Sequence, residues 1–198
     1  MPRLVLASAS ASRRALLTAA GLHFGVCPAD IDEAAVKRTA QSEGWTPQTA
    51  ALRLAGLKAE TIGRVQPDAL IIGSDQILVC DERWFDKPGT KPGLRTQLEQ
   101  LAGRQHCLVT AVVCSVGDEV VWEHVEQPLL TMRALSQAFL DAYVEQEGDA
   151  VAGCVGGYRL EGPGIQLFEA VIGDHSAILG LPLLPLLGFL RRHGVLAA

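Results

Sequence analysis

The run ALIIGSDQILVC, residues 69–80, limits more than any other feature what this chain can fold into. Its apolar, β-rich halves are typical of a strand that is covered on both faces of a sheet. Ser74 and Asp75 place polar groups in the middle of that strand. A buried carboxylate without a partner is costly, so we expect Asp75 to meet a cation, a metal ion or hydrogen-bond donors. Two interpretations of Asp75 stay open, a functional carboxylate or one half of a structural ion pair.

The rest of the chain alternates between strand-like and helix-like patterns. Strands are predicted over residues 3–7 and 24–27, and a β-hairpin turning at Gly117 and Asp118 over residues 106–133. Helices are predicted over residues 12–20, 46–62, 93–103 and 136–146, with a last helix ending near Arg192. Residues 28–34 are predicted as an acidic loop, residues 80–90 as a turn-rich segment, and residues 156–174 as a glycine-punctuated segment with little helical pattern. This order predicts an α/β fold with one mixed sheet, in a single domain over residues 1–198.

The composition argues against several classes of protein. Seventeen basic and twenty-two acidic residues give a net charge of -5, which does not favour binding to nucleic acid or anionic membranes. The five cysteines are never spaced as CxxC, so we expect reduced thiols and no zinc site. The apolar run ILGLPLLPLLGFL is interrupted by Pro182 and Pro185 and is shorter than the roughly 20 residues of a membrane span. We therefore expect a soluble, cytoplasmic protein with no nucleic-acid or membrane partner.

The stretch LASASASRRALL joins the first predicted strand to the first predicted helix. Hydroxyl groups and free backbone N–H groups at a helix N-terminus bind anions, and arginine adds donors that match phosphate oxygens. Ser8, Arg13 and Arg14 are therefore candidates for phosphate binding. In the alternative interpretation, Ser10 or Ser12 only caps the helix and both arginines lie in water.

Two further groups of charged residues lie in predicted loops and helices. Glu33 follows Asp32 in the acidic loop, and Lys58 lies on the next predicted helix. Carboxylates beside a lysine can hold Mg²⁺ against a polyphosphate, although an acidic loop in water is the other interpretation. Lys87, in DKPGT, precedes a proline that favours extended backbone, and is either a functional cation or a solvated one.

The segment GGYRLEGPG carries one more candidate. Its glycines allow a ligand to approach the backbone closely, and Glu161 beside them can accept hydrogen bonds from the edge of a base. A plain turn is the alternative interpretation.

Taken in order, the motifs LASASASRRALL, DIDEA, RLAGLKA, IIGSDQ, DKPGT, GYRLEGPGIQLFE and LGLPL resemble the Maf family of nucleoside triphosphate pyrophosphatases. The resemblance covers almost the whole chain. It implies a fold similar to that of inosine triphosphatase, with an elongated mixed sheet, flanking helices and two lobes around a cleft. It also implies a homodimer that hydrolyses the bond between the α- and β-phosphates of a nucleoside triphosphate with a divalent cation, Mg²⁺ or Mn²⁺.

The resemblance also implies roles for particular residues. The family's phosphate-binding loop corresponds to Ser8, Arg13 and Arg14, and its catalytic residues correspond to Glu33, Lys58, Asp75 and Lys87. Glu33 and Asp75 would hold the metal ion, and Asp75 would activate water. The lysines and Arg14 would neutralise charge that develops on the triphosphate.

Two motifs indicate the subfamily. GSDQ, which ends at Gln76, and the glutamate at Glu161 resemble the members of the family that act on 7-methyl-GTP. The chemistry agrees, because one carboxylate can accept hydrogen bonds from both guanine donors, the N1–H and the 2-amino group. Where the family usually has proline and then a large residue, this chain has Ala11 and Ser12, so the third residue expected to set specificity, Ser12, departs from the pattern. Two alternatives stay open: a dTTP and UTP pyrophosphatase of the same family, and a nucleotide-binding regulator of cell division with weak hydrolysis.

Overall fold

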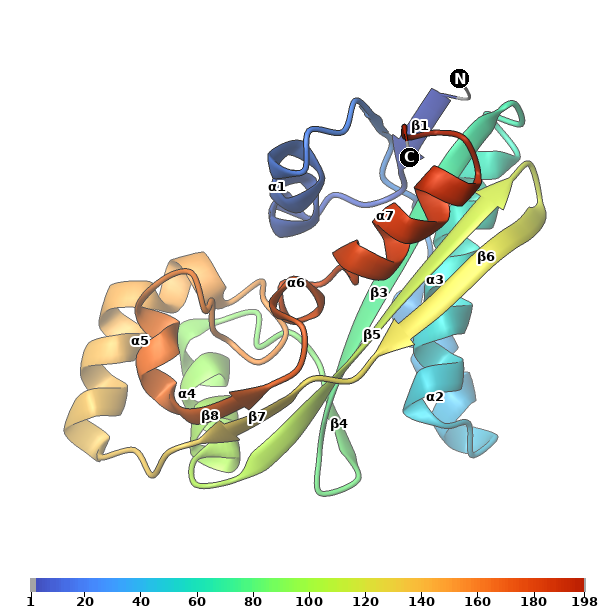
Figure 1. Cartoon of the computed structure of the whole chain (residues 1–198). Coiled ribbons are helices and arrows are strands. Elements are labelled where there is room, and N and C mark those ends of the chain that lie inside the picture. Colours follow the sequence, from blue (N-terminus) through green and yellow to red (C-terminus); the bar gives the residue numbers. More distant parts are fainter. Residues whose placement is uncertain (1–2, 198) are drawn as a thin grey trace. The chain divides into compact units, whose positions relative to one another are not determined.

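The computed structural model describes residues 3–197 as an α/β protein (Figure 1). The helices of this part of the chain are α1 (Ala11–Ala19), α2 (Glu33–Ser42), α3 (Pro47–Gly63), α4 (Lys91–Leu101), α5 (Gln137–Val151), α6 (His175–Ile178) and α7 (Leu183–Arg192), with a 3₁₀ helix, η1, over Pro163–Leu167. Its strands are β1 (Arg3–Leu6), β2 (Gly25–Val26), β3 (Ala69–Cys80), β4 (Arg83–Phe85), β5 (Gln105–Val116), β6 (Glu119–Glu126), β7 (Leu129–Met132) and β8 (Phe168–Ile172).

The strands pair as the mixed sheet that the sequence predicts. The hydrogen-bonded order is β2-β1-β3-β5-β7-β8, with β4 paired to β3 and β6 paired to β5. β1 is parallel to both β2 and β3, whereas the pairs β3–β4, β5–β6, β5–β7 and β7–β8 are antiparallel. The hairpin between β5 and β6 turns at Gly117, whose φ of 59° lies in the left-handed region that glycine adopts without strain. The predicted hairpin and its turn are confirmed.

Side-chain caps start the helices where the sequence places them. The Thr46 hydroxyl accepts a hydrogen bond from the Thr49 N–H, and Pro47 stands at the first helical position of α3. Ser136 caps α5 in the same way. At α1 the cap is Ser10, whose side chain accepts from the Arg13 N–H, so the helix begins at Ala11.

Several elements, among them α2, β4, β8 and η1, lie where the sequence pattern did not predict them. α2 begins inside the predicted acidic loop, because the Asp32 carboxylate accepts from the Ala35 N–H and caps a helix whose composition is mostly polar. β4 and β8 form in segments predicted as turn-rich or glycine-punctuated. Both strands are short. They form because β4 pairs with β3 and β8 pairs with β7, and a local sequence pattern does not predict such pairing.

The chain divides into two compact units. Unit 1 holds residues 3–76, 110–126 and 174–197 of the described chain, and unit 2 holds residues 77–109 and 127–173. β3 and β5 each run from one unit into the other, so neither unit is a continuous stretch of sequence. This interleaving explains why no boundary or linker is visible in the sequence. The single domain and the two lobes around a cleft stay predictions.

In unit 1, alternate residues of β3 face two different layers. Leu70 and Ile72 lie in a buried cluster with Leu17 of α1 and with Leu186 and Leu190 of α7. Because side chains alternate along a strand, the residues at odd positions point to the other face, where α3 packs. Asp75 therefore belongs to the α3 face of the strand.

The approach of α3 to this face is unusually close. A Cβ atom built on Gly73 would lie 2.1 Å from the Ala55 carbonyl oxygen and 2.9 Å from the Ala59 nitrogen. At the end of the helix, a Cβ on Gly63 would lie 1.8 Å from the Gly117 carbonyl oxygen. The helix backbone thus rests directly on the sheet, which brings the side chains of α3 within reach of β3.

Unit 2 has its own core, built around an aromatic group. Nε2 of His106 lies 2.6 Å from the Tyr158 hydroxyl oxygen. The Tyr158 ring packs edge-on against the Phe168 ring, with 4.8 Å between the ring centroids. Burial lowers the pKa of His106 to about 4, so the imidazole is neutral at neutral pH. The group ties the segment around Tyr158 to β5 and β8.

All five cysteines lie in the described part of the chain and are free of disulfide bonds, as the sequence predicts. Burial raises the pKa of the Cys114 thiol well above its usual range, so this thiol stays protonated at neutral pH. Within residues 3–197, no helix has both the length and the apolar character that crossing a bilayer requires.

Candidate active site

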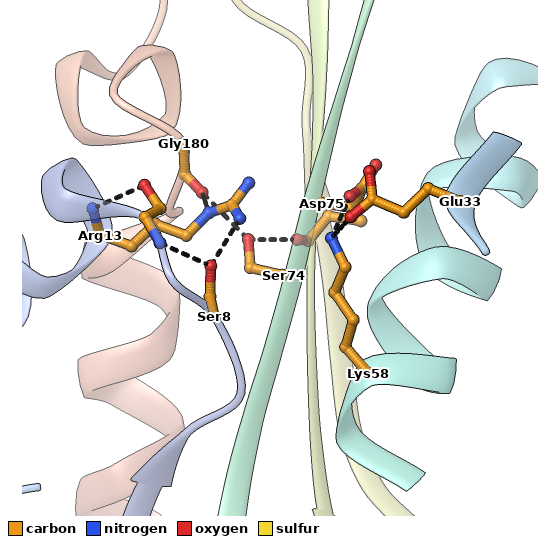
Figure 2. A network of polar contacts seen from close by, with 9 residues as sticks. Ser8, Arg13, Glu33, Lys58, Ser74, Asp75 and Gly180 are labelled. Atoms are coloured by element: carbon orange, nitrogen blue, oxygen red, sulfur yellow. Dashed lines mark hydrogen bonds and ion pairs between the residues drawn. The ribbon is translucent and has the colours of Figure 1, made fainter. Parts of the chain in front are cut away.

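Lys58 lies at the centre of a buried ion-pair cluster in unit 1. Its ammonium nitrogen is 2.6 Å from Oδ1 of Asp75 and 2.7 Å from Oε1 of Glu33 (Figure 2). Lys58 is 7 % exposed and Asp75 is 5 % exposed, so both charges lie almost entirely out of water. One ammonium thus holds two carboxylates from different elements at one point.

Local structure explains how these three side chains meet. Asp75 points from β3 toward α3, and the close contact at Gly73 brings Lys58 of α3 to it. Asp32 caps α2, which makes Glu33 the first residue of that helix and directs it to the same place. Of the two neighbouring carboxylates predicted in the acidic loop, one is therefore a helix cap and the other a partner of Lys58.

A second polar network surrounds Arg13. Its Nε donates to the Gly180 carbonyl oxygen at 2.7 Å, and its Nη1 donates to the Ser8 hydroxyl at 3.1 Å (Figure 2). The same hydroxyl accepts from the Ser10 N–H at 3.2 Å. The Ser8 hydroxyl and the Gly180 carbonyl thus hold the Arg13 guanidinium from two sides.

The two networks are electrostatically linked. Burial lowers the pKa of the Arg13 guanidinium, and the negative charges of Asp75 and Glu33 oppose that effect. Positive and negative side chains of unit 1 therefore gather just beyond the stretch in which β1 and β3 pair in parallel, where β1 ends and beside the middle of β3. Ligands of open α/β sheets bind at such strand ends.

The other predicted residues of α1 behave differently from Arg13. Arg14 is exposed and Ser12 is half-buried, on the first turn of the helix. The cap is Ser10, so the expectation that Ser10 or Ser12 caps this helix is confirmed for Ser10. The alternative in which both arginines lie in water is wrong, because the Arg13 side chain makes two internal hydrogen bonds.

Gln76 lies on the opposite face of β3 from Asp75. Its amide nitrogen donates to the Thr110 hydroxyl at 2.8 Å and to the carbonyl oxygens of Ala177 and Ile178 at 3.0 and 3.1 Å. Three internal contacts thus occupy the amide nitrogen of a residue predicted to set substrate specificity.

Lys87 and Glu161 belong to unit 2. Lys87 is exposed, between β4 and α4. Burial raises the pKa of the Cys154 thiol. The negative charge of Glu161 raises this pKa further, and the positive charges of Arg159 and Lys87 lower it. Lys87 and Glu161 thus both interact electrostatically with the Cys154 thiol of unit 2.

An ion pair holds the glycine-rich segment that carries Glu161. Arg159 donates to Oε2 of the buried Glu147 at 2.9 Å, and this hydrogen bond raises the pKa of the guanidinium. Tyr143, also on α5, donates to the Gly157 carbonyl oxygen at 3.2 Å. The segment is thus tied to α5 on both sides of Tyr158, and Glu161 lies in a turn in which the Gly162 N–H donates to the Arg159 carbonyl oxygen at 3.4 Å. The choice between a base-reading Glu161 and a plain turn stays open.

The donor set at Lys58 has the composition that a hard divalent cation prefers. Within residues 3–197 there is no group of three or more His, Cys, Asp or Glu side chains suited to hold a metal ion alone. Glu33 and Asp75 nevertheless converge on one point, and Mg²⁺ commonly takes one or two carboxylates and completes its shell with substrate phosphates and water. The pair therefore fits a metal ion that binds together with a polyphosphate.

Three residues of this region were not predicted as contributors to the site. Ser74 and Gly180 take part in the Arg13 network, and Thr110 bonds Gln76 and the Ala177 carbonyl oxygen. Ser74 was visible as a polar residue inside a buried strand, and Gly180 as part of LGLPL. Their connection was not visible, because their partners are distant in sequence.

Fold and site together define an α/β protein with two carboxylates, a buried lysine and an internally hydrogen-bonded arginine beside the end of β1 and the middle of β3. The family model described as "Maf-like protein" matches residues 3–193, and the chain belongs to this family. It is 52% identical to the "Nucleoside triphosphate pyrophosphatase" of Granulibacter bethesdensis over 98% of both chains. It is 46% identical to the "7-methyl-GTP pyrophosphatase" of Rhizobium meliloti, over 100% of this chain and 99% of that protein. A third relative, the "Nucleoside triphosphate pyrophosphatase" of Gluconobacter oxydans, is 51% identical over 98% of this chain and 97% of its own length.

Proposed function

We propose that this chain is a nucleoside triphosphate pyrophosphatase, a hydrolase that acts on an acid anhydride. The observation that carries the proposal is the cluster of Lys58 with Asp75 and Glu33, buried in unit 1 near the Arg13 guanidinium. A buried carboxylate, a second carboxylate that is partly exposed and two cations are groups that can bind a triphosphate and activate water beside it. The names of the relatives support the same reaction.

In this reaction water attacks the α-phosphorus and the bond to the oxygen bridging the α- and β-phosphates breaks. Asp75 accepts a proton from the water, and Oδ2 is the accepting oxygen because Lys58 holds Oδ1. The hydrogen bond from Lys58 to Oδ1 orients the Asp75 carboxylate. The products are a nucleoside monophosphate and pyrophosphate.

Positive side chains balance the charge of the triphosphate. Arg13 presents a fixed guanidinium, supported by Ser8, while the exposed Arg14 adds charge from the first turn of α1. We propose the roles of the two arginines from the resemblance and from the residue chemistry. For Lys87 we propose a phosphate-binding role from the resemblance alone.

A divalent cation, Mg²⁺ or Mn²⁺, fits the carboxylates of Glu33 and Asp75. When bound, it would neutralise phosphate charge and polarise a phosphoryl oxygen. Glu33 is exposed enough to turn toward such an ion, since its side chain is 40% exposed. Asp75 stays anchored to Lys58 while this happens.

The proposed reaction can be tested with purified protein and a panel of nucleoside triphosphates. With Mg²⁺ or Mn²⁺ present, we expect release of pyrophosphate and monophosphate in equal amounts, without free inorganic phosphate. The panel should include GTP, 7-methyl-GTP, UTP and dTTP. If the protein binds these nucleotides but releases no pyrophosphate from any of them, the regulator alternative replaces the enzyme.

Within the panel we propose 7-methyl-GTP as the preferred substrate. A carboxylate at Glu161 can accept from the guanine N1–H and 2-amino groups together, and a negative group favours the cationic 7-methylated ring. Three relatives at 44–46% identity carry the name 7-methyl-GTP pyrophosphatase. The departure at Ala11 and Ser12 removes a large side chain that could stack on the base, so affinity is expected to rest mainly on Glu161. The dTTP and UTP alternative predicts the opposite order in the panel.

Glu161→Gln is expected to lower the kcat/KM measured with 7-methyl-GTP about tenfold or more, while changing the value measured with UTP by less than about threefold. The reason is that the amide keeps one acceptor but loses the charge and places a donor against a guanine donor. Kinetics on both nucleotides check this, with Glu169→Gln on β8 as the matched control. Equal losses on all nucleotides would exclude Glu161 from base recognition.

Two further proposals come from the resemblance. A homodimer is expected in solution, and a cytoplasmic location is expected for a nucleotide-hydrolysing protein with free cysteines.

A further inference from the structure

The segment from Asp174 to Gly180 is held to β3 and β5 by side-chain hydrogen bonds to its backbone carbonyls. The Thr110 hydroxyl donates to the Ala177 carbonyl oxygen at 2.9 Å. Gln76 donates to the same carbonyl at 3.0 Å, and to the next one along the chain at 3.1 Å. The segment therefore cannot shift without breaking several buried hydrogen bonds.

Ser74 contacts the last carbonyl of this segment, that of Gly180. Its hydroxyl is completely buried and lies 2.8 Å from the Ala111 carbonyl oxygen and 3.0 Å from the Gly180 carbonyl oxygen (Figure 2). That second carbonyl also accepts from Arg13 Nε at 2.7 Å. One oxygen atom thus joins a strand hydroxyl to the arginine.

The backbone at Gly180 is adapted to this arrangement. Its φ of 102° lies in the region that L side chains rarely adopt, and a Cβ there would come within 3.3 Å of Arg13 Nε. The guanidinium therefore packs directly on the glycine whose carbonyl holds it. Any displacement of Gly180 moves the donor groups of Arg13 as well.

We propose that Ser74, together with Gln76, positions Arg13 for phosphate binding by fixing the segment that carries the Gly180 carbonyl. This rests on the proposed function, in which Arg13 binds the triphosphate. Ser74 and Gln76 thus position a phosphate-binding residue and do not contact the base of the nucleotide. Both residues lie on the face of β3 opposite to Asp75. Ser74 acts through the Gly180 carbonyl, and Gln76 acts through the carbonyls of Ala177 and Ile178.

A double-mutant cycle tests the coupling of Ser74 to Arg13. The variants are Ser74→Ala, Arg13→Ala and the double variant, and the measurement is calorimetric binding of inorganic tripolyphosphate, which has no base. We expect Ser74→Ala to weaken binding about tenfold in the native background and less than twofold when Arg13 is already alanine. Full additivity of the two effects would overturn the inference.

Ser115→Ala is the matched control for this cycle. Ser115 is a completely buried serine of β5 whose hydroxyl has no hydrogen-bond partner among residues 3–197, so its loss should leave tripolyphosphate binding unchanged. If Arg13→Ala itself leaves binding unchanged, the proposed phosphate role of Arg13 is wrong and the positioning role falls with it. If Arg13→Ala weakens binding but Ser74→Ala does not, the positioning role alone is wrong.

Gln76→Met provides a second measurement should Ser74→Ala fail to fold. We expect it to weaken tripolyphosphate binding and to raise the KM values for GTP, UTP and 7-methyl-GTP by a common factor, leaving the order of preference unchanged. A change in base preference with unaltered tripolyphosphate binding would overturn the inference and make Gln76 a base-reading residue.

Discussion

Asp75→Asn is expected to lower kcat for pyrophosphate release by about 10³-fold while nucleotide binding survives. The change keeps the size of the side chain but removes the proton acceptor, and general-base catalysis typically contributes 10²–10⁴-fold. Lys58 keeps Glu33 as a partner at 2.7 Å, so the ammonium is not left alone in the protein interior. We therefore expect folding to survive, with a stability loss smaller than the roughly 3–5 kcal/mol of a fully broken buried pair.

The measurement combines steady-state kinetics with denaturant unfolding of the same preparations. Asp118→Asn is the matched control, because Asp118 is an exposed aspartate in the β5–β6 turn of the same unit. Its kcat should be unchanged. Retention of full activity by Asp75→Asn would remove Asp75 from the role of base and leave it as one half of a structural ion pair.

Gly73→Ala is expected to destabilise the protein by about 3 kcal/mol and to lower kcat with it. The new methyl group would stand 2.1 Å from the Ala55 carbonyl oxygen, and because that atom is backbone, α3 as a whole must move away from β3. The movement would also carry Lys58 away from Asp75, whose present separation is 2.6 Å. Denaturant unfolding and pyrophosphate release measure the two consequences.

Gly56→Ala, in the middle of α3, is the control for this substitution. A Cβ there would meet only Oε1 of Glu60 at 3.8 Å, which is ordinary contact. Since alanine is the better helix former by up to about 1 kcal/mol, the control should be neutral or more stable. Equal destabilisation by both substitutions would show that the effect is general to glycine in this interface and not due to the close approach at Gly73.

Much of the secondary structure followed from the sequence because its causes are local. Thr46 and Pro47 start α3, Ser136 starts α5 and Gly117 turns the β5–β6 hairpin, each acting within a few residues of itself. The buried strand β3 was equally clear, since its apolar run reports burial on both faces. α2 was not predicted, because its mostly polar composition gives little helical pattern and Asp32 was assigned to a loop instead of being recognised as a helix cap.

The candidate site was predicted in part. Glu33, Lys58 and Asp75 were named from their motifs, and the structure brings these three together. The difference between Arg13 and Arg14 was not predictable, because both belong to one dipeptide and only the position of Gly180 decides which guanidinium is held.

The sequence by itself determined which residue types this protein has for its chemistry and in which local elements they stand. Their partners were decided only by the tertiary structure. Asp75 meets Lys58 across seventeen positions, and Ser74 meets the Gly180 carbonyl across 106. The physical reason is that neighbouring residues of a strand point to opposite faces, so Ser74 and Asp75 serve two separate networks. Which helix or segment covers each face depends on packing over the whole chain, and no local pattern records it.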